Sequence, residues 1–172
     1  MPSNASSYRS RYLAIGCLPS EVSLAFKPMY ELTLGSKRRA KEARQFVVGL
    51  LKGRRIKPWR AGEEIRASIP LHAAHKLPDH LFKIDAALDT FSQAAATSAG
   101  VEEILGITPL ERRRWTKDGR LPLSGQGSFA RGRQSIYFPL HPVAQIAALA
   151  RQPKTIEGWR SQDEKESPSS KI

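Results

Sequence analysis

Residues 106–119 constrain the fold of this chain more than any other segment, because they carry the start and stop signals of one short helix. Thr108 is a good N-cap residue, Pro109 suits the first helical position, and Glu111 completes a Thr-x-x-Glu capping box. Gly119 can adopt the left-handed conformation that commonly follows a helix, and Gly106 ends the helix before it. The sequence therefore predicts two short helices joined by a tight turn.

A Gly- and Ser-rich segment, residues 123–133, follows these helices and leads into residues 135–138, which have the composition of a β-strand. This pattern predicts a β-hairpin with a flexible basic tip. Beyond Pro139, apolar residues recur at helical spacing and predict a further helix that packs on the first two. These apolar residues are Leu140, Val143, Ile146, Ala147 and Ala150.

This order of elements resembles the MerR/excisionase-like winged helix-turn-helix superfamily over residues 97–150. The residues that carry the resemblance are the Gly-Ile-Thr-Pro turn at 106–109, Arg-Arg-Trp at 113–115, Asp-Gly-Arg-Leu-Pro at 118–122 and Ile-Tyr-Phe at 136–138. The resemblance implies a winged helix-turn-helix whose second helix enters the major groove of double-stranded DNA. It also implies that Trp115 packs in the core, and that Leu110, Glu111, Arg113 and Arg114 face the groove or its walls.

The chain departs from the family at two places. Arg112 stands where members usually have an apolar residue. Effector-sensing MerR regulators also carry a long dimerising coiled coil after the domain, and no segment after Ala150 has that pattern. We therefore expect no small-molecule effector. A homodimer or higher oligomer is still expected, because one short recognition helix contacts too few base pairs to specify a site.

The charge of the chain favours a polyanionic partner, since 28 Lys and Arg outnumber 16 Asp and Glu and give a formal net charge of +12. Between residues 112 and 133, seven basic residues accompany a single acid, Asp118. We assign Lys117 to the recognition helix, and Arg120, Arg131 and Arg133 to wing or phosphate contacts.

A second basic cluster lies between residues 37 and 60, where ten basic residues accompany only Glu42. One interpretation is a surface helix whose cations are simply solvated, and the other is a second phosphate-binding patch. The residues of this candidate patch are Lys37, Arg38, Lys41, Arg44, Arg54, Arg55 and Lys57.

The expected fold class is mainly α, a winged helix-turn-helix with a small β-hairpin wing, preceded by an α-rich (α+β) N-terminal region. Three parts are expected: a basic N-terminal region (1–92), a winged helix-turn-helix domain (93–155) and a disordered tail (156–172) rich in Ser, Lys and Glu. Within the first part, residues 36–52 predict an amphipathic helix, residues 84–91 another helix, and residues 30–34 a short strand.

Enzymatic chemistry has one candidate cluster, formed by His72, His75, Asp79 and His80, whose side chains could bind a divalent metal or transfer protons. Its spacing fits no nuclease or hydrolase pattern, so we expect no catalytic residues, no metal and no cofactor. The single Cys17 favours a reducing cytoplasm, and no apolar stretch is long enough for a membrane span.

The sequence therefore predicts a cytoplasmic, nucleoid-associated protein that binds double-stranded DNA sequence-specifically, as a bacterial, phage or mobile-element transcriptional regulator. An excisionase-like recombination directionality factor and a DNA-packaging recognition subunit remain alternatives. A protein- or RNA-interaction module and a metal-dependent nuclease are alternatives from other classes.

Overall fold

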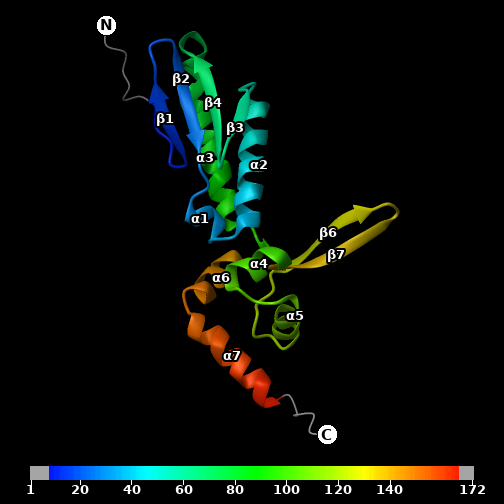
Figure 1. Ribbon diagram of the computed structural model, residues 1–172. Helices are drawn as coiled ribbons and strands as arrows, with labels where there is room; N and C mark the ends of the chain where they lie inside the picture. The colour runs from blue at the N-terminus through cyan, green and yellow to red at the C-terminus, as the bar shows by residue number, and fades with distance from the viewer. Residues whose placement is uncertain (1–7, 167–172) are drawn as a thin grey trace. The chain divides into compact units, whose positions relative to one another are not determined.

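The computed structural model describes residues 8–166. The chain divides into two compact units, Met1–Gln93 and Ala94–Ile172, which we call unit 1 and unit 2 (Figure 1). The structure is about 52% helix and 25% strand and contains two antiparallel sheets. The fold is therefore α+β, and the expectation of a mainly α fold is wrong. None of the helices in the described part of the chain is long and apolar enough to cross a membrane.

Unit 1 is built on a four-stranded antiparallel sheet with the strand order β1-β2-β4-β3 (Figure 1). The strands are β1 (Leu13–Cys17), β2 (Glu21–Phe26), β3 (Pro58–Ala61) and β4 (Glu64–Pro70). Alternate residues of the two central strands are buried, which is the period of a sheet with one covered face. The buried residues are Val22, Leu24 and Phe26 of β2 and Ile65, Ala67 and Ile69 of β4. The N-terminal region is therefore α+β, with a four-stranded sheet that the sequence analysis did not identify.

Helices α2 (Lys37–Gly53) and α3 (Leu77–Gln93) supply the other half of the unit 1 core. The helix predicted at residues 36–52 is confirmed as α2, and the Ser36 hydroxyl caps it by accepting a hydrogen bond from the Arg39 N–H at 3.1 Å. A 3₁₀ helix, η1 (Leu71–Lys76), precedes α3, which includes the helix predicted at residues 84–91.

The strand predicted at residues 30–34 is wrong. These residues form the short helix α1 (Tyr30–Thr33), which ends at Leu34 in the left-handed conformation with φ of 49°. Leu32 and Thr33 are both buried, so consecutive side chains face the core. A half-buried strand would instead have alternated between core and solvent.

Up to residue 166, unit 2 contains four helices and a three-stranded sheet in the order β5-β7-β6 (Figure 1). The helices are α4 (Ser98–Leu105), α5 (Pro109–Lys117), α6 (Val143–Ala150) and α7 (Pro153–Glu166), and the strands are β5 (Ala96–Thr97), β6 (Gly125–Arg131) and β7 (Gln134–His141). The core of this unit gathers apolar residues from its helices around Trp115. The hairpin of β6 and β7, which we call the wing, extends beyond this core (Figure 1).

The disordered tail predicted from residue 156 is wrong for residues 156–166, which belong to α7. Ile156 is buried, and Trp159 packs against the unit 2 core. Asp163 is also buried, so residues at i, i+3 and i+7 form a narrow inward face in a segment that is otherwise Ser-, Lys- and Glu-rich. The rest of the predicted tail, residues 167–172, lies outside the described residues.

Candidate nucleic-acid interface

The turn between α4 and α5 is fixed by hydrogen bonds that the sequence predicted. Gly106 has φ of 61° and ends α4. The capping box of α5 is confirmed: the Glu111 N–H donates to the Thr108 hydroxyl at 3.2 Å, and the Thr108 N–H donates to a Glu111 carboxylate oxygen at 2.7 Å. Ile107 is buried between these two caps. The turn is therefore closed at both ends and anchored at its centre.

The inward face of α5 is set by Trp115 and Arg112. Trp115 is fully buried and meets the ring of Trp159 edge-on, with 5.0 Å between ring centroids. Arg112 is 9% exposed, and its Nε donates to Glu102 of α4 at 2.7 Å. Arg112 therefore lies at an inward position, where the family usually has an apolar residue. A salt bridge between α4 and α5 takes the place of apolar packing there.

The outward face of α5 carries Leu110, Arg113, Arg114 and Lys117, which follow one another at i, i+3, i+4 and i+7. All four are exposed, and Leu110 keeps 66% of its surface. Leu110 therefore does not pack in the unit 2 core, although its side chain is apolar. The structure therefore brings four of the predicted recognition residues onto one accessible stripe.

Glu111, the remaining predicted recognition residue, lies at the flank of this stripe and is already bonded. Its carboxylate accepts from Arg160 of α7 at 2.7 Å in addition to the Thr108 N–H. The hydrogen bond from Arg160 is the main reason that its pKa is lowered, with smaller contributions from Thr108. Glu111 is therefore a charged structural group that fixes the N-terminal end of α5.

Asp163 fixes the other end of α5, and sequence reasoning missed it because the residue fell in the predicted tail. Its carboxylate accepts from Trp115 Nε1 at 2.9 Å, from Arg114 at 2.9 Å and from Arg120 at 2.7 Å. Burial alone would raise the pKa of Asp163, but these three donors lower it to about 2. The signal in the sequence was the spacing of Ile156, Trp159 and Asp163 on one helix face.

Arg120 was predicted to contact phosphate, and the structure places it in this same network. Its guanidinium contacts Asp118 at 2.5 Å as well as Asp163, and lies 5.7 Å from the centre of the Trp115 ring. The hydrogen bond that Arg120 donates to Asp118 is the largest cause of its raised pKa. Arg120 therefore stabilises the C-terminal end of α5. Its charge is largely neutralised by Asp118 and Asp163 and is not available to a phosphate group.

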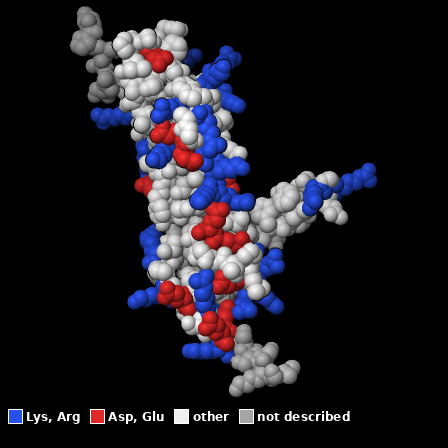
Figure 2. Space-filling view, in the orientation of Figure 1, with Lys and Arg blue, Asp and Glu red and all other residues white. Residues whose placement is uncertain are grey.

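The wing ends in a two-residue turn at Gly132 and Arg133, where Gly132 has φ of 63°. Arg131 and Arg133 are both exposed, and Figure 2 shows Lys and Arg side chains at the far end of the wing. Two aromatic residues outside the predicted site, Phe129 and Tyr137, are also exposed on the wing, at 52% and 67%. The wing therefore presents cations at its tip and aromatic rings along its length.

The base of the wing is tied to the core by His141, which is fully buried. Its Nδ1 lies 2.7 Å from the Pro122 carbonyl oxygen and donates to it, and its Nε2 is buried with no partner in the described residues. Burial lowers the pKa of His141, and the nearby charge of Arg112 lowers it further. The imidazole is therefore neutral at pH 7.

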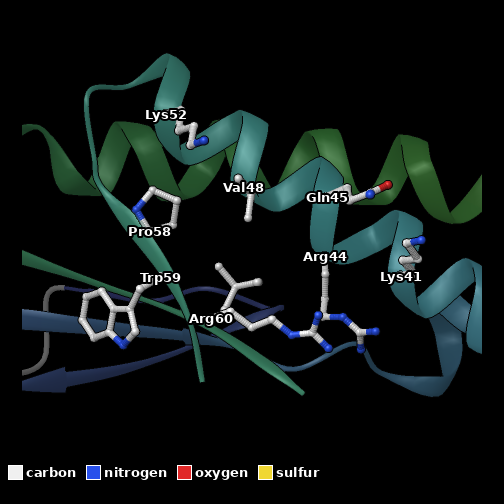
Figure 3. A pocket seen from close by; sticks show the side chains of 9 residues that line it. Lys41, Arg44, Gln45, Val48, Lys52, Pro58, Trp59 and Arg60 are labelled. Atoms are coloured by element: carbon white, nitrogen blue, oxygen red, sulfur yellow. The ribbon is translucent and has the colours of Figure 1, made fainter. Parts of the chain in front are cut away.

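In unit 1, the residues of the second basic cluster are divided between different cavities. Lys41 and Arg44 of α2 line a groove of about 320 Å³ against β3, together with Lys52 and Arg60 (Figure 3). Figure 3 shows the Arg44 and Arg60 guanidinium groups pointing toward each other. Glu63 bonds to both, at 2.5 Å from Arg44 and 3.8 Å from Arg60, so this pair is partly neutralised.

The other members of the cluster lie elsewhere in unit 1. Arg54, Arg55 and Lys57 line a different pocket, between the end of α2 and the segment that begins α3. Lys37 and Arg38 are exposed at the start of α2 and line neither of these cavities.

The His72–His80 segment folds as η1 and the first turn of α3. Asp79 is paired with Lys83 at 2.8 Å, and His75 and His80 line the same pocket as Arg54. Within residues 8–166, no group of three or more His, Cys, Asp or Glu side chains is placed to hold a metal ion.

Comparison with known proteins found no matching family model, no matching curated protein and no matching solved structure.

Proposed function

We propose that this chain is a sequence-specific double-stranded DNA-binding protein that places α5 in the major groove. The observation that carries the proposal is the division of α5 into two faces. Trp115 and Arg112 fix the inner face of α5 to the rest of unit 2. On the outer face, Leu110, Arg113 and Lys117 are exposed and form a stripe of cations with one apolar side chain. The major groove admits a single α-helix, and side chains on one helix face reach the base edges.

Arg113 is the best candidate for a base contact. It is exposed, whereas the neighbouring Arg114 is only 46% exposed and bonds to Asp163. Arginine recognises guanine through two parallel hydrogen bonds, and Leu110 is suited to apolar contact with a thymine methyl group. Lys117 lies at the end of α5, where a cation reaches the phosphate backbone. We therefore assign specificity to Arg113 and Leu110, and orientation to Lys117.

The wing contributes phosphate or minor-groove contacts in this proposal. Arg131 and Arg133 at its tip are long enough to follow the backbone or enter a narrow minor groove. Contacts of this kind strengthen binding to all sequences and make the affinity fall with salt. A protein of this function acts at the nucleoid, as a transcriptional regulator, a recombination accessory factor or a packaging subunit.

The experiment is a selection of binding sites from random duplex DNA by the full chain, followed by binding measurements on the selected site. Arg113→Ala is compared with Arg151→Ala, which removes an exposed arginine at the end of α6. Arg113→Ala is expected to cost about 1–3 kcal/mol of binding free energy and to relax the preference at one or two positions. Arg151→Ala is expected to retain the selected preference, because both variants remove one positive charge but only Arg113 lies on the stripe.

Equal losses in the two variants would contradict the proposal, because they would reflect net charge rather than a base contact. Failure of the selection to enrich any sequence, together with tight binding to single-stranded or folded RNA, would favour the RNA-interaction alternative. The mass of the complex on the selected site tests whether the protein binds as a homodimer. A dimer is expected to select two half-sites about 10 base pairs apart.

A further inference from the structure

A second anionic ligand is indicated by a pocket in unit 1 that the DNA-binding proposal does not use. The pocket has a volume of about 430 Å³ and lies between the turn after α2, the end of β4 and the η1–α3 segment. Six cationic or titratable residues line it, and none of the lining residues that the structure describes is acidic. These six are Arg54, Arg55, Lys57, His75, Lys76 and His80.

The end of α2 explains why three cations gather at this pocket. Ile56 is buried, and its N–H bonds back to the Leu51 carbonyl at 3.0 Å, which closes the helix. Arg55 adopts φ of 61°, an uncommon conformation for a residue other than glycine. This turn anchors Ile56 in the core, while the flanking Arg55 and Lys57 remain exposed.

Arg54 adds a polar group that the protein itself does not satisfy. Its Nη1 donates to the Leu50 carbonyl at 2.8 Å, which holds the side chain in place. Its Nε is buried, with no hydrogen-bond partner in the described part of the chain. The Arg54 side chain is therefore fixed in place at the wall of the pocket, next to Arg55 and Lys57.

His75 and His80 also line the pocket. Burial is the main reason that the pKa of His80 is lowered, and Arg54, Lys83 and Lys76 lower it further against the opposing effect of Asp79. A neutral imidazole N–H can still donate a hydrogen bond to an oxyanion. The surrounding cations oppose a divalent metal at His75 and His80, because they repel another positive charge. The His cluster in the sequence therefore fits an anion better than a metal.

We propose that this pocket binds a phosphate group, with Arg54, Arg55, Lys57 and Lys76 as its cationic contacts. Arginine presents paired N–H donors that match phosphate oxygens, and lysine supplies compact charge beside them. The phosphate can belong to a nucleic-acid backbone or to a free phosphorylated small molecule, because the chemistry of recognition is the same. The site lies within unit 1 and does not depend on the function proposed for α5.

The test titrates the full chain with inorganic phosphate, with a nucleoside 5′-monophosphate and with a short DNA duplex, and follows backbone amide resonances by NMR. Saturable shifts of the Lys57 and Lys76 amides are expected for phosphate or the monophosphate, with a Kd on the order of 1 mM or tighter. Lys57→Gln and Lys76→Gln change exposed residues, so they are expected to fold and to weaken binding several-fold. Lys37→Gln removes an exposed cation of α2 outside the pocket and is the matched control.

The duplex separates the two sources. If Lys76→Gln also weakens duplex binding and reduces its salt dependence, the bound group is a backbone phosphate. If it affects only the monophosphate, the ligand is a small phosphorylated molecule. Either result supports the site. Absence of saturable shifts with all three probes, or an equal effect of Lys37→Gln, would overturn it, and neither result depends on whether α5 binds DNA.

Discussion

Replacing Asp163 by asparagine is expected to destabilise unit 2 by about 2.5 kcal/mol, although the residue lies far along the chain from α5. The pKa of Asp163 falls from the ordinary 3.8 to about 2 in the folded protein. At about 1.4 kcal/mol per pKa unit, this difference corresponds to about 2.5 kcal/mol of preferential interaction with the ionised carboxylate. Asp163→Ala should cost about 1–3 kcal/mol more, because the buried N–H of Trp115 then loses its acceptor.

Urea denaturation followed by tryptophan fluorescence measures this effect, since Trp115 and Trp159 lie in unit 2 and Trp59 can be changed to phenylalanine in all variants. Glu164→Gln is the control, because it removes one negative charge from an exposed neighbour of Asp163 on the same helix. The stabilisation is present above pH 4 and is lost as the pH falls toward 2, because protonation of the folded state then removes the charge. A difference between Asp163→Asn and Glu164→Gln below about 0.5 kcal/mol would refute the reasoning.

Two further predictions concern the wing. Gly127→Ala would place its Cβ 2.5 Å from the ring of Phe138, so the ring must move and the stability of the wing should fall by about 1 kcal/mol. Faster hydrogen exchange in β6 and β7 and shifted Phe138 resonances would show this loss. Ser128→Ala, on the same strand, should leave both the exchange rates and the resonances unchanged. His141→Asn keeps a donor near the Pro122 carbonyl and removes a buried group whose pKa is lowered by burial. Protonation of the unfolded chain below pH 6.5 should therefore destabilise wild-type unit 2 more than the variant, and parallel melting temperatures from pH 7.5 to 5.5 would exclude this role for His141.

Local signals predicted the α4–α5 segment well. The Thr108 capping box and the glycine at 106 act over three or four residues, so their hydrogen bonds could be inferred without knowing the rest of the fold. The unit 1 sheet was missed although β2 alternates between buried and less buried residues. Its partners are distant, as in the pair of Val22 with Ile69, and single-strand patterns do not identify such partners.

The sequence predicted which residues of the candidate site are charged, but it did not predict how their side chains are paired. The sequence placed basic residues on α5 and the wing, but it did not distinguish free cations from neutralised ones. Arg113 is exposed on the stripe, whereas Arg120 is bound by Asp118 and Asp163. In unit 1, Arg44 is likewise paired with Glu63. These pairs form between residues brought together by folding, so charge counts along the chain overestimate the surface available to a partner.

Contacts from α7 to both ends of α5 define where a working fragment of this protein has to end. Glu111 near the start of α5 is bonded by Arg160, and Arg114 near its end is bonded by Asp163. A fragment cut after Ala150 would retain α4, α5, the wing and α6, yet both ends of α5 would lose their partners. The minimal unit that can hold this helix in its observed position therefore extends through Asp163, and the α7 backbone is part of the scaffold rather than an appendage.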